Sequence, residues 1–380
     1  MPIDLSQEFP QNHDICYLNH AAVSPWPNRA ATAVKSFAQE NTVFGATNYP
    51  NWMKVETELR EKLKHLINAK STKEIALAKN TSEALSVIAY GITWQKGDTV
   101  LITNQEFPSN RIVWESLKDQ GVNVRVVDVD NHETASQNII NHLNKSVRLL
   151  SLSAVEYASG LRLNLNAIGA RCKEVDALFC IDAIQWLGAL PFDAQKCHAD
   201  FVVADGHKWM LGPEGLAVFY VREPLITTLK LHQFGWHMVK SRGNYDIQTW
   251  QPANDATRFE CGSPNMLGAT ALNASLGVLL EFGMNEVARS LSAKTDYLIK
   301  SLQNLPGVTI ISPTQPSLKA GIVTFKVMNT DHQALYRSLM SKGVICACRG
   351  GGIRFSPHFY TPEPVLDNAI SILTELINSQ

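Results

Sequence analysis

Short apolar runs alternate with amphipathic segments through the middle of the chain. The length and continuous apolar character of the runs predict buried strands over residues 100–103, 122–127, 147–152, 177–181, 201–203 and 216–220. Helical spacing of apolar residues lies between several of them, as in residues 109–120 and 166–175. The alternation predicts an α/β fold with a large, doubly wound and mainly parallel sheet. Ligands bind beyond the carboxyl ends of such strands, so residues that directly follow a strand are the candidates for function.

The pattern changes after about Pro264. Two long helical patterns, at 266–282 and 287–305, precede a mixture of strand-like runs at 321–327 and 352–356 and helical patterns at 331–342 and from about Pro364. This mixture predicts a smaller α+β domain. A chain of 380 residues suits two domains. We expect a large α/β domain over residues 16–263, a small C-terminal domain over residues 264–380, and an arm, residues 1–15, that packs on the small domain or on a partner.

Composition narrows the possible partners. The formal net charge is -1, so no overall field attracts nucleic acid or an anionic membrane. No apolar run reaches the ~18–20 residues that span a bilayer, and the first ten residues do not resemble a secretion signal. The seven cysteines form no disulfide framework, and the pair Cys346 and Cys348 has no second pair to complete a metal site. We expect reduced thiols, no metal and a cytoplasmic protein.

Lys208 follows one of the predicted strands. It lies five residues beyond the run 201–203, and residues 212–215 (GPEG) then turn the chain into another strand. A partly desolvated lysine amine condenses with an aldehyde to form a Schiff base. A lone lysine is far more often a solvated surface residue, so Lys208 needs support from other residues.

Asp182 supplies part of that support, because it ends the strand 177–181. A carboxylate at the end of an apolar strand is costly without a cationic or hydrogen-bonding partner, and a protonated pyridine nitrogen is such a partner. At ~4 Å and an effective dielectric constant of ~20, that ion pair is worth roughly 4 kcal/mol before desolvation, or about three pKa units. A helix N-cap is the alternative role of Asp182.

The third element is residues 80–83 (NTSE), which open an apolar helix over residues 84–92. Thr81 and Ser82 cap this helix, and the free backbone N–H groups of its first turn form an anion site. A cap without any bound phosphate is the alternative.

Together these motifs resemble the class V aminotransferases, a fold-type-I family of enzymes that use pyridoxal 5′-phosphate (PLP). The resemblance covers nearly the whole chain, and each motif is weak alone. In order, the motifs are YLNHAA at 17–22, NTSE at 80–83, EFPSN at 106–110, DAIQ at 182–185, DGHK at 205–208, RFECGSPN at 258–265 and GIRFSPHFY at 352–360.

The resemblance implies a role for each matching residue. Lys208 is the Schiff-base lysine and proton shuttle, and Asp182 pairs with the pyridine nitrogen. Gln185 contacts the ring hydroxyl oxygen, and Phe107 stacks on the ring. The phosphate site is expected to include Thr81, Ser82, His207 and Asp205.

The resemblance also implies substrate and subunit contacts. Arg354 binds the substrate carboxylate, a role that suits a bidentate guanidinium, with Asn19 and Tyr157 beside the substrate. Ser263 stands where relatives reach the phosphate of the neighbouring subunit, so the resemblance implies a homodimer with shared sites.

Three departures from the family pattern bear on the reaction. Cysteine desulfurases carry a reactive cysteine shortly before the carboxylate-binding arginine, whereas residues 349–353 here are RGGGI. Asp205 stands where relatives often have a hydroxyl or a histidine, and an unpaired aspartate repels phosphate. Tyr157 stands where desulfurases tend to have an asparagine.

These features favour an amino-acid lyase that cleaves a carbon–sulfur bond of cysteine, cystine or a conjugate without a persulfide cysteine. The alternatives are an aminotransferase, a kynureninase-like hydrolase, which Phe107 fits, and an isopenicillin N epimerase-like enzyme. A non-catalytic scaffold of the same fold is a further alternative, against which Lys208, Asp182 and Arg354 together argue.

Overall fold

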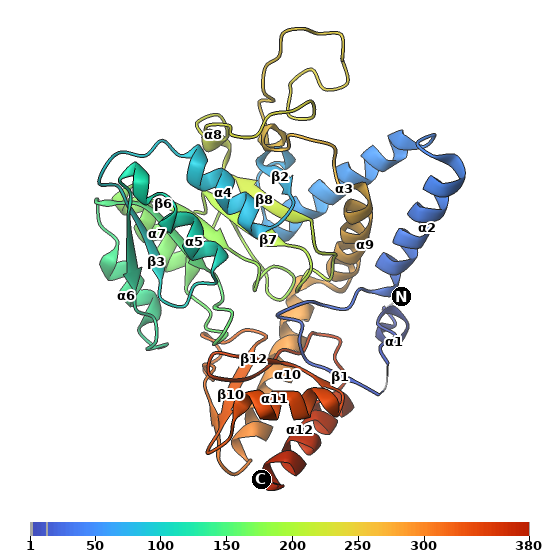
Figure 1. The fold of residues 1–380 in the computed structure, drawn as a ribbon, viewed down its shortest axis with the longest axis vertical. Helices are drawn as coiled ribbons and strands as arrows, with labels where there is room; N and C mark the ends of the chain where they lie inside the picture. Colours follow the sequence, from blue (N-terminus) through green and yellow to red (C-terminus); the bar gives the residue numbers. More distant parts are fainter. Residues whose placement is uncertain (1–2, 13, 380) are drawn as a thin grey trace.

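A seven-stranded sheet forms the centre of the larger unit in the computed structural model, which describes residues 3–12 and 14–379 (Figure 1). The strand order is β2-β8-β7-β6-β5-β3-β4. Only β8 runs antiparallel to its neighbours β2 and β7, and the β3–β4, β3–β5, β5–β6 and β6–β7 pairs are parallel. The strands are β2 (Ile75–Ala78), β3 (Thr99–Thr103), β4 (Asn123–Val127), β5 (Val147–Ser153), β6 (Leu178–Asp182), β7 (Phe201–Asp205) and β8 (Ala217–Val221). This architecture confirms the predicted doubly wound α/β fold.

Helices cover both faces of the sheet, because successive residues of its buried strands point to opposite sides. In β7, Phe201 and Val203 join one core with α4 (Thr81–Gly91) and α5 (Ser109–Glu115), which a 3₁₀ turn, η2 (Lys118–Gln120), follows. Val202 and Ala204 join the other core. Its helices are α3 (Tyr49–Ile67), α6 (Ala135–His142), α7 (Leu165–Val175) and α9 (Met266–Phe282).

A second, antiparallel sheet organises the C-terminal part of the chain. Its order is β12-β13-β10-β9, and its core includes Leu298, Phe325, Phe355 and Leu366. The elements are α10 (Met284–Gln303), β9 (Val308–Ile310), β10 (Val323–Val327), α11 (His332–Ser341), β11 (Val344–Ile345), β12 (Ala347–Arg349), β13 (Gly352–Phe355) and α12 (Glu363–Asn378). The proposed boundary near Pro264 precedes α9, which packs on α2 (Asn28–Phe44) and α3.

The N-terminal segment touches both units. After α1 (Leu5–Glu8), β1 (Cys16–Tyr17) pairs in parallel with β11 of the smaller unit. His20 is buried, and its ring contacts the carbonyl oxygen of Ser356 and the hydroxyl of Tyr360, both at 2.8 Å. Four residues later, the Ser24 N–H donates to the carbonyl of His207 at 2.8 Å. Residues 16–24 therefore connect the smaller unit to the loop that carries Lys208.

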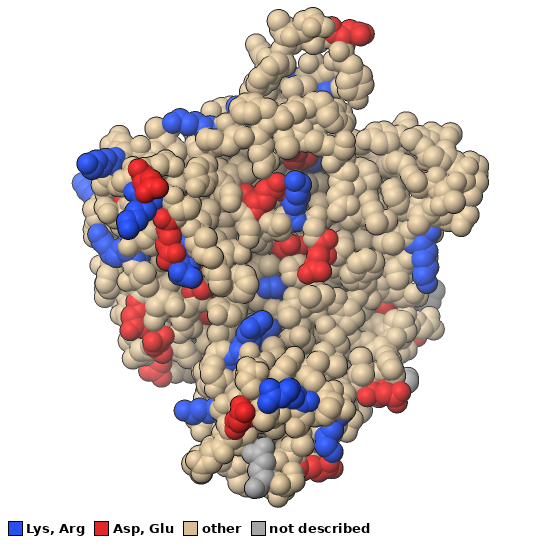
Figure 2. Space-filling view, viewed as in Figure 1, with Lys and Arg blue, Asp and Glu red and all other residues tan. Residues whose placement is uncertain are grey.

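Between α8 (Glu223–Ile226) and the 3₁₀ turn η3 (Ala256–Phe259), a long loop projects away from the sheet (Figure 1). It exposes five large apolar side chains, Phe234, Trp236, Tyr245, Ile247 and Trp250. A further 3₁₀ turn, η1 (Thr72–Glu74), precedes β2. Charges of both signs are scattered over the face in Figure 2. Within residues 3–12 and 14–379 no single helix meets the length and apolarity of a membrane span; α9 and α10 reach them only jointly and meet at a bend of 82°.

Candidate active site

A cavity of about 320 Å³ opens at the carboxyl ends of β6 and β7. Asp182 ends β6 and Asp205 ends β7, and these parallel strands are neighbours in the sheet. The N-terminus of α4 closes one side of the cavity with Thr81 and Ser82. The predicted site residues that line the cavity are Thr81, Ser82, Phe107, Tyr157, Asp182, Gln185, Asp205, His207, Lys208 and Arg354.

Burial shifts both central charges of the cavity toward their neutral forms. It raises the pKa of Asp182 to about 6, although a hydrogen bond from the Ile184 N–H (3.0 Å) and the charge of Lys208 act in the opposite direction. Burial likewise lowers the pKa of Lys208 to about 8, against the attraction of Asp182 and with the repulsion of Arg354. A lysine with a lowered pKa has a larger neutral, nucleophilic fraction at neutral pH.

The anion-binding end of the cavity is the first turn of α4. The Asn80 side chain, and not Thr81 or Ser82 as expected, caps this helix by accepting from the Glu83 N–H at 2.9 Å. The Thr81 hydroxyl accepts from the Asp205 N–H at 3.1 Å, and the Ser82 hydroxyl lies 2.8 Å from that of Ser109. Helix N-termini of this kind attract phosphate groups.

Asp205 and His207 sit beside this helix end as a pair. Oδ1 of Asp205 lies 3.0 Å from Nδ1 of His207, but the two atoms lack hydrogen-bond geometry and have no other partner in the described chain. An imidazolium at His207 would offset the repulsion between Asp205 and a phosphate.

Arg354 also lines the cavity. Its Nη1 donates to the Tyr157 carbonyl at 2.7 Å, and its Nη2 donates to Oδ1 of Asn19 at 3.5 Å. Its Nε is buried without a hydrogen-bond partner among the described residues. Burial, together with the nearby charge of Arg349, lowers the pKa of Arg354 to about 10. The orphaned donor indicates that this guanidinium has capacity for an anionic ligand.

Another part of the cavity wall is formed by the aromatic side chains of Phe107 and Tyr157 and by the amide of Gln185. The Phe107 ring meets that of Tyr157 edge-on with centroids 5.2 Å apart, and Nζ of Lys208 lies 5.7 Å from the Phe107 centroid. The Gln185 side chain is oriented by two bonds: its Nε2 donates to the Ala21 carbonyl, and its Oε1 accepts from the Trp209 indole. One N–H of this amide is left for a ligand, since an amide nitrogen has two.

Two predicted site residues lie outside the cavity lining. Asn19 lies next to the cavity: its side chain accepts from Arg354, and its backbone carbonyl accepts from the Ala22 N–H. Ser263 is exposed and borders a different surface hollow, so its expected role toward a neighbouring subunit stays a prediction.

The sequence pattern did not single out Arg349, which also lines the cavity. Arg349 pairs with Gly352 across the β12–β13 hairpin, whose two turn residues, Gly350 and Gly351, have φ of 59° and 77°. Positive φ at both positions is typical of a type I′ turn, which requires glycine or asparagine. The signal in the sequence is thus the Gly-Gly pair, which predicts a tight hairpin and places Arg349 and Arg354 at one end of it.

The residues present fit PLP. The cavity has a lysine with a lowered pKa, a buried carboxylate for the pyridine nitrogen and a helix N-terminus for the phosphate. Buried polar atoms of Asp205, His207 and Arg354 also lack hydrogen-bond partners in the described chain, as expected of a site built around a polar ligand.

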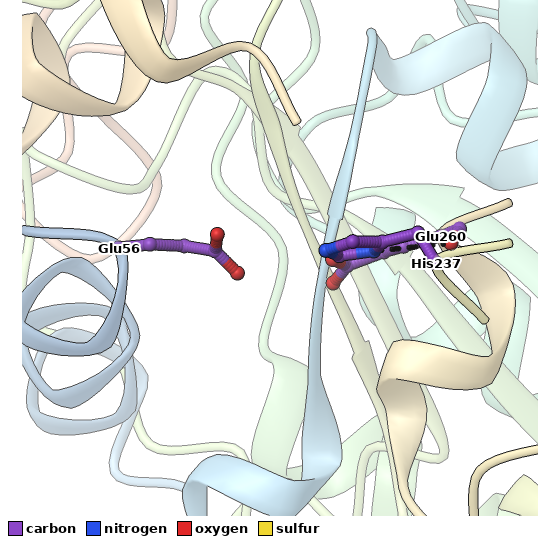
Figure 3. A group of neighbouring side chains, drawn as sticks. All are labelled: Glu56, His237 and Glu260. Carbon is purple, nitrogen blue, oxygen red and sulfur yellow. Dashed lines mark hydrogen bonds and ion pairs between the residues drawn. The ribbon is translucent and has the colours of Figure 1, made fainter. Parts of the chain in front are cut away.

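A second cluster lies behind the cavity, under the projecting loop. Glu56 on α3 faces His237 and Glu260 (Figure 3), and their ligand atoms all lie within 4.8 Å. The guanidinium of Arg60 already binds both carboxylates, at 2.6 Å to Glu56 and 2.7 Å to Glu260. Nη1 of Arg242 lies 2.6 Å from Nε2 of His237. We interpret the cluster as an ion-pair network that fastens the segment before Ser263 to α3.

Comparison with known proteins identifies the family. The family model "Aminotransferase class-V" matches residues 16–357. A probable cysteine desulfurase of Methanothermobacter thermautotrophicus is 29% identical over 381 residues, covering 94% of this chain and 93% of that protein. A cysteine desulfurase of Pectobacterium atrosepticum is 30% identical over 276 residues, or 71% of this chain and 66% of that protein. The chain therefore belongs to the class V aminotransferase family, which confirms the expected class of PLP-dependent enzyme.

Solved structures share the fold. The apo cysteine desulfurase from Thermococcus onnurineus NA1 superimposes with a TM-score of 0.89 at 23% identity, covering 100% of this chain and 99% of that one. The cystine C–S lyase C-DES, in complex with its product cysteine persulfide, superimposes with a TM-score of 0.88 at 23% identity, covering 97% and 99%.

Proposed function

We propose that this protein is a PLP-dependent carbon–sulfur lyase that acts on cysteine or cystine without a persulfide cysteine. The observation that carries the proposal is one cavity in which Lys208, Asp182 and Arg354 converge and to which no described cysteine contributes. The curated relatives are named cysteine desulfurases, and one protein of the same fold is a cystine C–S lyase.

Each charged residue has a definable task. When bound, PLP withdraws electrons from the α-carbon of an amino acid. Asp182 would pair with the pyridine nitrogen, and Lys208 would hold the cofactor's aldehyde carbon. Arg354 binds the α-carboxylate and so fixes the orientation of the substrate. Nζ of Lys208 would accept the proton from the α-carbon, and the electron pair left there would form a Cα–Cβ double bond as the sulfur leaves the β-carbon.

The cysteines argue against a persulfide relay. Cys346 is buried, and burial raises its pKa to about 12. Cys348 is partly exposed, but its pKa is also raised, first by burial. Thiols with raised pKa values are weak nucleophiles at neutral pH. We therefore expect the sulfur to leave with the product and not to be held on the protein.

Arg349 favours cystine as the substrate. Its side chain has no hydrogen bond or ion pair within residues 3–12 and 14–379, although it lines the cavity beside Arg354. A second guanidinium at the mouth of the cavity suits a second carboxylate on the substrate. Cystine has one at its far end, and cysteine has none.

The test is product analysis with both amino acids. Elimination yields pyruvate, ammonia and sulfide from cysteine, and pyruvate, ammonia and cysteine persulfide from cystine. Lys208→Ala should abolish turnover, and the double variant Cys346→Ser/Cys348→Ser should stay within a few-fold of the parent. Arg349→Met should raise KM for cystine and leave KM for cysteine nearly unchanged.

Other products would contradict the proposal. Alanine together with a protein-bound persulfide that vanishes in the double cysteine variant would identify a desulfurase. Amino transfer that requires a keto acid, hydrolysis of kynurenine, or epimerisation of an amino acid would identify the corresponding alternative.

We further propose that two copies form a homodimer with shared sites in the cytoplasm. Ser263 is exposed outside its own cavity, and the nearby loop exposes Tyr245 and Trp250. Exposed aromatic clusters are typical of protein interfaces. The seven unpaired cysteines support a reducing compartment.

A further inference from the structure

Three buried carboxyl groups lie together beneath the cofactor cavity. Asp182 borders the cavity, whereas Glu106 and Glu156 are buried behind it, with 7% and 0% of their surface exposed. The two glutamates follow strands β3 and β5 in the chain, and both reach the hydroxyl of Thr103 at the end of β3. Three negative charges in so small a buried volume would be prohibitively costly, so the location of protons in this group matters.

Glu106 is surrounded by donors: a backbone N–H and an amide N–H₂, which cannot accept, and the Ser153 hydroxyl, which lies 2.7 Å from Oε2. The backbone N–H of Ser153 lies 2.9 and 3.1 Å from its two oxygens. The Asn110 amide nitrogen donates to Oε2 at 2.7 Å. The orientation of that amide is fixed independently, because its oxygen accepts from the Ser151 hydroxyl and the Trp114 indole. Both oxygens of Glu106 are therefore acceptors, as in an ionised carboxylate.

Glu156 has a different environment. Its Oε1 lies 2.8 Å from the Thr103 hydroxyl, and its Oε2 is buried without a partner among the described residues. The Thr103 oxygen also lies 3.0 Å from Oε1 of Glu106 and accepts from the Gln105 N–H at 3.3 Å. A hydroxyl has one proton and cannot donate to two carboxylates at once. One of the glutamates must donate to Thr103, and Glu106 is already committed as an acceptor.

We propose that Glu156 is a neutral carboxylic acid that donates to Thr103, whose own proton goes to the ionised Glu106, and that this chain positions the loop carrying Phe107 at the cofactor cavity. Glu106 directly precedes Phe107 and binds the end of β5 through Ser153. Ser153 is in turn paired with Asp182 across β5 and β6. The proton on Glu156 thus removes one of three negative charges and leaves the loop and two strand ends fastened together.

The electrostatics agree with this assignment. Burial raises the pKa of both glutamates, and it raises that of Glu156 further. Hydrogen bonds from Ser153 and Asn110 counteract the rise at Glu106, whereas at Glu156 the bond with Thr103 is the only one that does so.

Two substitutions distinguish this arrangement from the reverse one, in which Glu106 would be neutral and Glu156 ionised. Glu156→Gln retains a donor to Thr103, so we expect the PLP dissociation constant of the holoenzyme to stay within about twofold and Tm to be unchanged. Glu106→Gln points an amide N–H₂ at the Ser153 N–H, which lies close to both carboxyl oxygens and cannot accept. Such a mismatch of buried groups corresponds to roughly a 10-fold or larger weakening, measured as PLP release by fluorescence. Glu156→Leu, which has no donor, should resemble Glu106→Gln more than Glu156→Gln.

Infrared spectroscopy tests the proton directly and does not depend on turnover or on the lyase assignment. The difference spectrum of the parent holoenzyme minus Glu156→Gln should show a carboxylic-acid C=O band. A difference spectrum with only carboxylate bands would overturn the proposal, even if Glu106→Gln fails to fold. Equal weakening of PLP binding by Glu156→Gln and Glu106→Gln would overturn it as well.

Discussion

Asp182 combines complete burial with a titration in the accessible range, since its pKa is raised to about 6. In the protein without PLP, the folded-state pKa exceeds the ordinary value of 3.8. The folded protein therefore loses stability as pH rises through about 4 to 6, because the carboxyl must ionise in a buried place. PLP binding has the opposite requirement, because only the carboxylate pairs with a protonated ring.

We predict that PLP affinity falls as pH decreases below about 6, since Asp182 must then lose a proton before it can pair with the ring. Titration of the purified protein with PLP by fluorescence between pH 5 and 8 measures this. The phosphate of PLP also titrates near pH 6, so Asp182→Asn is the matched control. If Asp182→Asn shows the same pH dependence as the parent, the carboxyl of Asp182 is not its source.

The sequence could predict the site residues that follow strands, but it could predict few of the contacts between buried side chains around the cavity. Lys208 and Asp182 follow apolar runs, so their common location comes from the strand pattern itself. Glu156 gives no such signal, because its role depends on which atoms of β3 and β5 meet. Asp205 was expected to repel phosphate, and the sequence contains no indication that His207, two residues later, turns back toward it.

At the level of elements, the ion-pair network of Arg60 joins α3 to the segment that leads to Ser263. The side chains of Arg60, Glu56 and Glu260 are all nearly buried. Removing one partner of a buried network leaves uncompensated charges, which typically costs about 3–5 kcal/mol.

We predict that Arg60→Met lowers Tm markedly, although methionine keeps most of the apolar volume. The matched control is Arg111→Met, which breaks an i,i+4 pair with Glu115 whose side chains are each 48% exposed. Exposed pairs contribute under about 1 kcal/mol, so Tm should barely change. Differential scanning calorimetry measures both, and equal losses of Tm would mean that the buried network contributes no more than a surface pair.

The elements that could be predicted are those whose apolar residues follow one clear pattern along the sequence. Residues 266–282 form α9 as expected, and the six predicted strands all lie in the central sheet. The antiparallel direction of β8 has no signature in one sequence, because a fully buried strand is apolar in either direction. The predicted helix 109–120 ends as α5 at Glu115 and continues as a 3₁₀ turn. The strand β2 was not predicted, because its apolar run, Ile75–Ala78, has only four residues.

For the whole molecule, the exposed aromatic loop and Ser263 lead to the prediction that dimerisation and PLP retention are linked. Tyr245→Ser/Trp250→Ser should shift the protein toward monomer and speed PLP release on dilution. Sedimentation velocity and fluorescence measure the two effects. Met328→Ser, at an apolar residue exposed on the smaller unit, should change neither.

Ser263→Asp tests the proposed sharing of the phosphate site between subunits separately. The added negative charge should weaken PLP binding several-fold without dissociating the dimer, because like charges repel in a partly buried site. A monomer that keeps full PLP occupancy at low concentration would show that each site is complete within one chain.

The N-terminal segment, residues 16–24, links the two units mechanically. It is hydrogen-bonded to β11 and Ser356 of the smaller unit, while Ser24 and Ala21 are bonded to the lysine loop and to Gln185. Burial lowers the pKa of His20 to about 4, so its ring stays neutral and these bonds persist across the physiological pH range. Residues 21–23, which line the cavity, are therefore tied to both units, and we expect a rotation of the smaller unit to displace them together with Arg354. If Arg354 binds a carboxylate, we expect this segment to couple the position of the smaller unit to that of the Lys208 loop.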